Sequence, residues 1–383
     1  MNLKAFEAAL EAAVDSGKIA GAVALITDRE GATYEHVAGV RVSGQSAGMD
    51  AGTLFWIASM TKAVVSVGAL RLVEQGKLSL DADLGDLLPD LKNLEVLEGV
   101  VDGKPRLRPA KGYVTLRQLL SHTSGFAYSF TDPKFLAYSQ TPGVLDPNSG
   151  TRAAHRQPLM FDPGQGFIYG IGIDWAGLAI EAASGQRLDA YLSEALFGPL
   201  GMSDTGFRLT PAQMARKASV HVRGPDGSLI PTPFAPLSEA EVLSGGGGLY
   251  STARDYGRFL RLLMSGDGQG VISASTLAGL SQSQSGPHRA GFIDSTVAAL
   301  SNDFDPYPDM GVGHGLATMV TPQPTGDGRG AGALAWAGLA NTYYWADPAA
   351  GLGGVLMTQL LPFADPTVLD LFRTLERGAY GVA

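Results

Sequence analysis

Strand-like segments lie at both ends of this chain, and mainly helical segments lie between them. Residues 22–27 and 33–40 are strand-like, and Asp28-Arg29-Glu30-Gly31 between them suits a hairpin turn. Three further strand-like segments close the chain: residues 333–339, 342–346 and 352–360. Strands at the two ends of a chain can share one sheet. We therefore predict an α+β fold with one antiparallel sheet built from both termini and flanked by helices, plus a mainly helical insertion.

Hydrophobic periodicity predicts the helices. Residues 3–15 carry apolar side chains on one stripe, as in an amphipathic helix. The other predicted helices cover residues 59–75, 114–125, 173–183, 187–197, 211–217, 252–264 and 367–377. Three stretches without periodicity are predicted as loops: residues 93–113, 126–160 and 223–237. The second of these is rich in aromatic residues and proline, so we expect it to cover a binding cleft.

Composition narrows the possible partners. The 383 residues include 45% hydrophobic and 17% charged residues, as in a folded globular protein. A net charge of −9 argues against nucleic acid or an anionic membrane as a partner. There is no cysteine, and the six histidines lack metal-ligand spacing, so we expect no metal and no cofactor. The start lacks the apolar core of a signal peptide and no run is long enough to span a bilayer, which favours a cytoplasmic protein.

One predicted helix begins at a serine and carries a lysine one turn later. Apolar residues recur at helical spacing from Ser59 to Gln75, and Gly76 stands where a helix C-cap belongs. Ser59 and Lys62 therefore share one face of the helix. A lysine whose pKa is lowered by burial or by a nearby cation can take the proton of a serine hydroxyl, and N–H groups at the helix start can bind an oxyanion. Alternatively, Ser59 is only an N-cap and Lys62 is solvated.

Three other residues are weaker candidates. Ser46 lies in Gly44-Gln45-Ser46-Ala47-Gly48, which matches the G-x-S-x-G nucleophile elbow, but no helix is predicted directly after it, so we expect a loop. His122 ends a short capped helix and is either a base or, more commonly at such a place, structural. Tyr169 lies between a glycine-rich turn and a helix, where it either points into a cleft or is buried.

Several motifs, taken in order, resemble those of the serine β-lactamase and penicillin-binding protein superfamily, and within it the class C β-lactamase-like carboxylesterases called family VIII. The motifs span most of the chain: Ser59-Met60-Thr61-Lys62, Leu119-Leu120-Ser121-His122-Thr123-Ser124-Gly125, Pro163-Gly164 followed by Tyr169, the glycine-rich run before Leu249-Tyr250-Ser251-Thr252, and Trp336-Ala337-Gly338. The resemblance implies a β-lactamase/transpeptidase-like fold. It implies an α/β domain of residues 1–80 and 289–383, a mainly helical domain of residues 81–288, and an active site in the cleft between them.

The resemblance also implies roles for individual residues. Ser59 would be the nucleophile, Lys62 and Tyr169 the base and acid pair, and the backbone N–H groups of Ser59 and Leu339 the oxyanion hole. Substrate contacts would come from Trp336, Ala337 and Gly338 on a late strand, and from Ile171, Phe126 and Tyr128 near the cleft.

Two departures from the class C β-lactamases bear on the substrate. Their Tyr-x-Asn motif is Tyr169-Gly170-Ile171 here, so the amide that would hold a β-lactam side chain is absent. Trp336-Ala337-Gly338 stands in place of Lys-Thr-Gly, so the lysine that would bind a substrate carboxylate is absent as well. We therefore expect a serine carboxylesterase acting on short-chain or aromatic esters as its small-molecule substrates.

The alternatives are a β-lactamase, a D-aminopeptidase or another amide hydrolase of the same superfamily, an acyltransferase, and a binding relative without activity. The natural substrate and the oligomeric state stay open.

Overall fold

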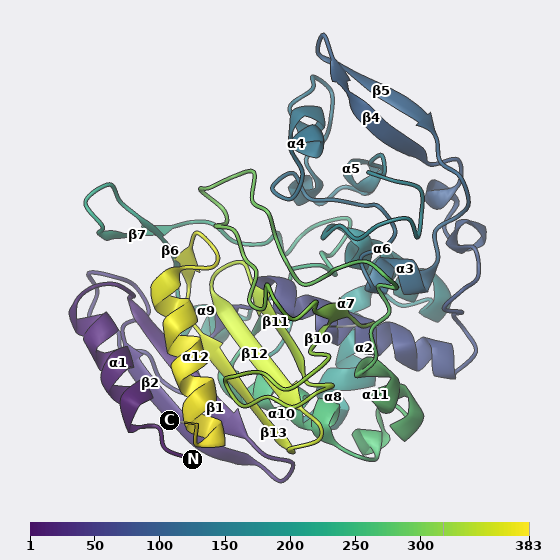
Figure 1. Cartoon of the computed structure of the whole chain (residues 1–383). Helices are drawn as coiled ribbons and strands as arrows, with labels where there is room; N and C mark the ends of the chain where they lie inside the picture. The colour runs from purple at the N-terminus through teal and green to yellow at the C-terminus, as the bar shows by residue number, and fades with distance from the viewer. Residues whose placement is uncertain (317, 383) are drawn as a thin grey trace.

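The computed structural model describes residues 1–316 and 318–382, and its central feature is a 7-stranded antiparallel sheet (Figure 1). The strand order is β2-β1-β13-β12-β11-β10-β9, so the N-terminal hairpin pairs with the C-terminal strands. The strands are β1 (Gly21–Thr27), β2 (Ala32–Gly39), β9 (Gly313–His314), β10 (Met319–Val320), β11 (Leu334–Gly338), β12 (Thr342–Asp347) and β13 (Leu352–Met357). In the register of β1 with β13, Leu25 lies opposite Val355. The predicted sheet built from both termini is confirmed.

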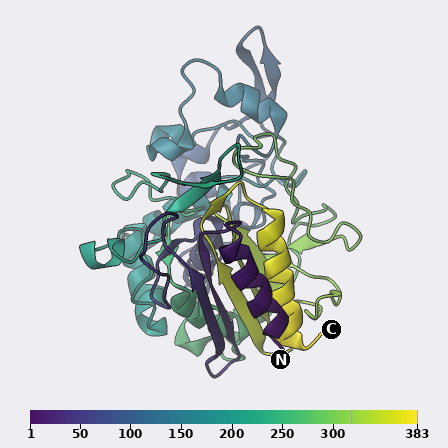
Figure 2. The same ribbon diagram turned by 90° about the vertical axis from the view of Figure 1, so that its left-hand side faces the viewer.

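Helices cover both faces of this sheet. Helices α1 (Lys4–Asp15) and α12 (Pro366–Tyr380) lie side by side on one face (Figure 2), and α10 (Ala253–Met264) packs against the other. Two neighbouring residues of β12 show that successive side chains point to opposite faces of the sheet. The Tyr344 ring lies 5.1 Å from that of Tyr256 in α10, whereas the Trp345 ring lies 5.6 Å from that of Phe372 in α12. Because both faces are covered at the centre of the sheet, β1 and β13 read as nearly continuous apolar runs, whereas the edge strand β2 is mostly exposed or half-buried.

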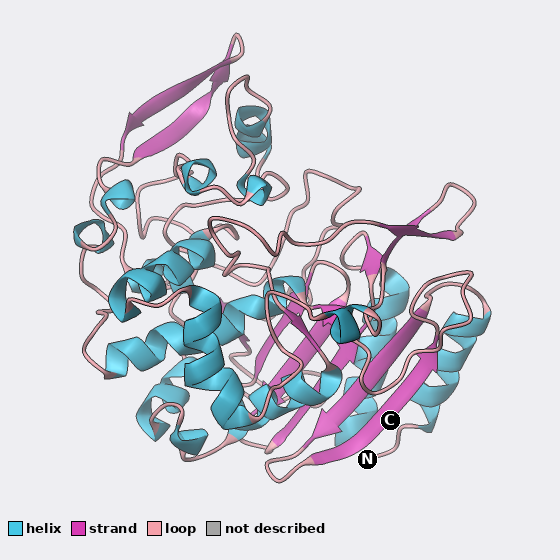
Figure 3. Cartoon of the chain, turned by 180° about the vertical axis from the view of Figure 1, so that it is seen from behind, coloured by secondary structure: helices cyan, strands magenta, loops and turns pink. Residues whose placement is uncertain are grey.

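Beside the sheet, α6 (Gly172–Ser184) packs against α2 (Thr61–Glu74), and α3 (Leu116–Leu120) and α7 (Leu188–Leu192) pack against α6 (Figure 3). The other helices are α4 (Pro133–Ser139), which packs against the projecting β4 (Glu95–Val101), α5 (Arg152–His155), α8 (Gly198–Leu200), α9 (Pro211–Met214) and α11 (Ala274–Leu280). Helix α2 is buried along most of its length, and at Gly68 the missing side chain lets α7 come close. The Tyr191 hydroxyl of α7 donates a hydrogen bond to the Gly68 carbonyl at 3.0 Å. Helix α2 is therefore a fixed support for the residues at its N-terminus.

Two segments predicted as loops form hairpins instead. Residues 93–113 contain β4 (Glu95–Val101) and β5 (Lys104–Pro109), which project from the body (Figure 1). Their turn is Asp102-Gly103, with φ of 50° and 70°, the positive values that a type I′ turn requires. Strands β6 (Val220–Arg223) and β7 (Leu229–Thr232) form the second hairpin, and β14 (Leu360–Leu361) pairs with β6. Charged and exposed side chains break the apolar alternation in β4 and β5, and β7 contains Pro231, a residue that is unusual within a strand. The loop predictions for these two segments were therefore wrong.

Other departures are smaller. Residues 126–160, predicted without periodicity, contain the short helices α4 and α5. Helix α10 falls inside the range assigned to the helical domain but packs on the sheet. Among the described residues, no helix combines the length and apolar character needed to cross a bilayer.

Candidate active site

Ser59 lies in one turn of 3-10 helix, Ala58–Met60, that leads directly into α2. Three hydrogen bonds hold this turn and its flanks: Ile57 N–H to the Leu249 carbonyl (3.0 Å), Leu249 N–H to Thr61 Oγ1 (3.1 Å), and the Tyr256 hydroxyl to the Met60 carbonyl (3.1 Å). The neighbouring strands β3 (Phe55–Trp56) and β8 (Tyr250–Ser251) pair just before it. Ala58 has a φ of 41°, which is uncommon for a residue with a side chain and persists only where the surroundings define it. The position of Ser59 is therefore well defined.

Lys62 is 1% exposed, and its ammonium group has three partners. Its Nζ lies 3.1 Å from Ser59 Oγ, 3.0 Å from the Tyr128 hydroxyl and 2.7 Å from the Gly246 carbonyl. A charged lysine donates to all three. A neutral amine can donate to Gly246 and Tyr128 and turn its lone pair to the Ser59 hydroxyl, which then donates. The same geometry thus suits both protonation states that a general base must visit.

Asp174 of α6 holds the carbonyl that Lys62 contacts. The Asp174 side chain is 3% exposed, and its Oδ1 accepts from Gly246 N–H at 3.0 Å and from Ser244 Oγ at 2.8 Å. A Cβ at position 246 would lie 2.4 Å from Asp174 Oδ2, so only glycine allows this approach. Asp174 therefore orients the glycine-rich segment against Lys62.

Tyr169 lies on the other side of Lys62. Its hydroxyl accepts a hydrogen bond from Trp336 Nε1 at 3.0 Å, and Lys62 Nζ lies 4.7 Å from the centre of its ring. In the described part of the chain, the tyrosine hydroxyl bonded to Lys62 is that of Tyr128. Burial raises the pKa of Tyr128 well above its ordinary value, with Asp174 adding to the effect, so this phenol keeps its proton at neutral pH.

His122 does not contact Ser59 in the structure. Its ring packs against Tyr169, with ring centres 4.6 Å apart, and against His314 at 4.9 Å. Burial holds the pKa of His122 well below its usual range and lowers that of His314 to about 4. Both imidazoles are neutral at pH 7. His122 therefore buttresses Tyr169 from behind.

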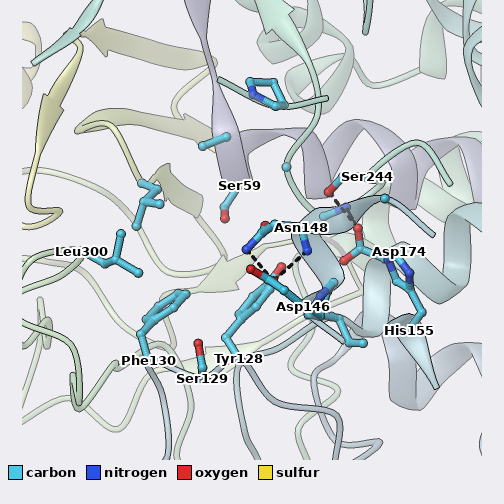
Figure 4. A pocket seen from close by; sticks show the side chains of 18 of the residues that line it. Ser59, Tyr128, Ser129, Phe130, Asp146, Asn148, His155, Asp174, Ser244 and Leu300 are labelled. Atoms are coloured by element: carbon cyan, nitrogen blue, oxygen red, sulfur yellow. Dashed lines mark hydrogen bonds between the residues drawn. The ribbon is translucent and has the colours of Figure 1, made fainter. Parts of the chain in front are cut away.

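Ser59 opens onto a cavity of about 540 Å³ (Figure 4). Leu300 and Phe130 lie on one side of Ser59 in this view, and Asp174, Ser244 and His155 lie on the other. None of the described residues that line the cavity is lysine or arginine. Lys62 itself lies behind the cavity wall.

The structure brings most of the predicted site residues to this cavity. Those that line it are Ser59, Tyr128, Tyr169, Ile171, Trp336 and Leu339. Besides Lys62, three others lie behind its wall. Phe126 is 1% exposed and stacks on Trp175, while Ala337 and Gly338 are buried in β11. A Cβ at position 338 would lie 2.3 Å from the Ile57 carbonyl oxygen, so Gly338 lets β11 approach the serine turn.

Sequence reasoning missed the parts that Asp174 and Gly246 play, and named Tyr128 only as a substrate contact. All three act through contacts between residues far apart in the chain, which no local pattern marks. Among the described residues, no cluster of three or more histidine or acidic side chains could hold a metal ion.

Comparisons with known proteins place the chain among others of the same length. The Beta-lactamase family model matches residues 6–378. A lovastatin esterase from Penicillium rubens is 32% identical over 389 residues, covering 97% of this chain and 96% of the esterase. A monacolin J acid methylbutanoyltransferase from Aspergillus terreus is also 32% identical, covering 98% and 94%. The structure of unliganded simvastatin synthase (LovD) from Aspergillus terreus is similar at a TM-score of 0.84 and 30% identity, covering 98% of this chain and 97% of the synthase.

Proposed function

Since the chain belongs to the beta-lactamase family, we propose that it is a serine carboxylesterase that works through an acyl-enzyme on Ser59. The observation that carries this proposal is the contact of 3.1 Å between Lys62 Nζ and Ser59 Oγ at the wall of the cavity. Elsewhere in the chain, Ser46 lies in the other serine motif, but it is exposed in a loop. A nucleophile and a base within hydrogen-bond reach are the minimum for this chemistry.

The proposed reaction has two halves. Lys62 takes the Ser59 proton as Oγ attacks the ester carbonyl, and the oxyanion lies between the N–H groups of Ser59 and Leu339. Collapse of this intermediate breaks the bond to the alcohol, which receives a proton from Tyr169, and Tyr169 is reprotonated from Lys62. Water then gives a proton to Lys62 and its oxygen to the acyl carbon. Ser59 recovers its proton from Lys62 as the acid leaves, so the enzyme ends as it began.

The cavity wall favours uncharged esters. It lacks lysine and arginine among its described residues and carries the carboxylates of Asp146 and Asp174, so a substrate carboxylate would be repelled. Ile171 stands where the class C β-lactamases have asparagine. Trp336-Ala337-Gly338 stands where their late strand has Lys-Thr-Gly, so the lysine of that motif is absent. Short-chain or aromatic esters suit these walls better than β-lactams or D-amino acid peptides do.

Acyl transfer to an alcohol is the second candidate. The relatives that favour it are the methylbutanoyltransferase and the synthase, each at least 30% identical over nearly the whole chain. The lovastatin esterase, equally similar, favours hydrolysis. Both outcomes use the same acyl-enzyme and differ only in whether water or an alcohol releases it.

Steady-state kinetics with p-nitrophenyl butyrate, p-nitrobutyranilide and nitrocefin would test the proposal. We expect the ester to have the highest kcat/KM, with activity abolished in Ser59→Ala and unchanged in the matched control Ser46→Ala. Added alcohols would reveal transfer as a butyrate ester among the products. Ester cleavage that survives in Ser59→Ala, or anilide or nitrocefin turnover above that of the ester, would refute the assignment.

A further inference from the structure

The Tyr169 hydroxyl has one hydrogen-bond partner in the described part of the chain, the indole of Trp336. Trp336 Nε1 lies 3.0 Å from the Tyr169 oxygen. An indole N–H can only donate a hydrogen bond, so the Tyr169 oxygen is the acceptor in this contact. The hydroxyl hydrogen of Tyr169 is therefore not used by Trp336 and is free to be donated to another group.

The Tyr169 ring is enclosed by its neighbours. The ring centres of His122, Trp336 and Tyr128 lie 4.6, 5.1 and 5.6 Å from that of Tyr169. Lys62 Nζ lies 4.7 Å from the same ring centre. Tyr169 is only 4% exposed, and it lines the cavity. The direction left open for its hydroxyl hydrogen is therefore the cavity, where a substrate would bind.

The sheet holds Trp336 in turn. Trp336 lies in the middle of β11, where it pairs with Tyr344 of β12, and it is 6% exposed. Its ring packs edge-on against the rings of Phe304 and His314, with centres 6.3 and 6.0 Å away. A side chain on an inner strand between such neighbours has little room to turn. The indole N–H therefore points at the Tyr169 oxygen from a fixed position.

We propose that Trp336 is a positioning residue for the acid step: its indole N–H holds the Tyr169 oxygen in place and stabilises the phenolate that forms when Tyr169 protonates the leaving alcohol. This inference rests on the proposed function, in which Tyr169 is the acid. In that step the ester C–O bond breaks, the Tyr169 proton moves to the alcohol oxygen, and Lys62 later returns a proton to Tyr169.

The energetic reason is the charge that develops on Tyr169. A hydrogen bond to an ionised oxygen is shorter and stronger than a bond between neutral groups, so the contact with Trp336 strengthens as Tyr169 loses its proton. An interaction that is stronger in the transition state than in the ground state raises the rate. Indole supplies this bond without a charge, which agrees with a cavity wall that has no lysine or arginine among its described residues.

Trp336 also forms part of the apolar wall of the cavity, and the two roles predict different kinetics. A wall residue contacts the substrate whether or not the leaving group needs a proton. A residue that positions the acid matters only where the leaving oxygen must be protonated. p-Nitrophenolate leaves as a stable anion, whereas the alkoxide of a hexyl ester needs the proton. Comparing p-nitrophenyl butyrate with hexyl butyrate therefore separates the two roles.

Trp336→Phe keeps an apolar ring and removes the N–H. We expect kcat/KM for hexyl butyrate to fall about 10-fold more than kcat/KM for p-nitrophenyl butyrate. The control Trp56→Phe makes the same exchange at another residue of the cavity wall, whose Nε1 donates to the Gly247 carbonyl at 2.6 Å. The control should slow both esters by one common factor. A common factor in Trp336→Phe as well would overturn the inference.

Two further measurements keep the test sharp if Trp336→Phe folds poorly. Replacement of Trp336 by β-(3-benzothienyl)alanine keeps the shape of the ring and exchanges the N–H for sulfur, so the same selective loss is expected without a cavity. In the Tyr169→Phe background, Trp336→Phe should add no further selective loss, because the hydroxyl that it serves is gone. A selective loss that persists in this background would contradict the proposal.

The outcomes separate this inference from the proposed function. If Tyr169→Phe slows the two esters equally, Tyr169 is not the acid, so that part of the proposed function fails and this inference fails with it. If Tyr169→Phe slows hexyl butyrate selectively and the changes at Trp336 do not, only the inference fails.

Discussion

Replacing Tyr128 by phenylalanine removes one oxygen, the hydroxyl that lies 3.0 Å from Lys62 Nζ. Lys62 is buried, so no bulk water replaces the lost partner, and one of its three donors stays unsatisfied. A hydrogen bond to a charged group contributes about 1.5–3 kcal/mol. We therefore expect Tyr128→Phe to lower kcat/KM by about 10- to 100-fold, since each 1.4 kcal/mol corresponds to a factor of about ten.

The assay compares two leaving groups. p-Nitrophenolate leaves as a stable anion, whereas an alkoxide must be protonated as it leaves. If Tyr128 only positions Lys62, Tyr128→Phe should slow p-nitrophenyl butyrate and hexyl butyrate by the same factor. Tyr169→Phe, which removes the proposed acid, should slow the hexyl ester far more. Wild-type kcat/KM in Tyr128→Phe would refute the reasoning, and a loss confined to the hexyl ester would make Tyr128 the acid.

Three further predictions concern the support of the site. Asp174→Ala should lower kcat/KM by about 10-fold or more, because the Gly246 N–H loses the acceptor that lies 3.0 Å away. Asp174→Asn keeps an acceptor and should lower kcat/KM less. Equal losses in the two variants would point to the charge of Asp174 as the cause. Gly170→Ala should unfold the protein at a lower temperature, because the new Cβ would lie 2.0 Å from the Phe126 carbonyl oxygen; an unchanged melting temperature would contradict the close packing. Burial lowers the pKa of His314 to about 4, so as the pH falls the unfolded chain protonates this histidine before the folded protein does. The stability present above pH 6.5 therefore decreases as the pH drops toward 4, by at most about 1.4 kcal/mol per pH unit. Urea unfolding of His314→Gln at pH 7 and pH 5 should show a smaller decline than the wild type does, and an equal decline would show that other groups cause it.

Much of the fold follows from the sequence because it depends on local patterns. The strands at both termini, the α1 and α12 helices and the serine helix all have apolar residues at regular spacing, and the family match over residues 6–378 confirms the β-lactamase-type fold. The hairpin at residues 95–109 was missed although Asp102-Gly103 is a strong turn signal. The strands that flank this turn are rich in charged residues and lack the apolar alternation on which a strand prediction depends.

Part of the candidate site could also be predicted from local sequence patterns, and part of it could not. Ser59 and Lys62 are three residues apart on one helical face, so their contact could be predicted from spacing alone. Tyr169 was found through the family resemblance and lies on the cavity wall. The bond from Lys62 to Tyr128 joins residues 66 positions apart, and that from Asp174 to Gly246 joins residues 72 apart. The first contact joins α2 to the loop that carries Tyr128, and the second joins α6 to the glycine-rich loop. A single sequence does not encode either pairing in a readable pattern.

The central claim is an acyl group on Ser59, and intact-protein mass spectrometry after brief exposure to p-nitrophenyl butyrate tests it most directly. We predict a transient butyryl adduct on the wild-type protein and on Ser46→Ala, none on Ser59→Ala, and release of the adduct by water or an added alcohol. A butyryl adduct on Ser59→Ala, or rapid ester cleavage with no adduct and no fluorophosphonate labelling of the wild type, would contradict the account.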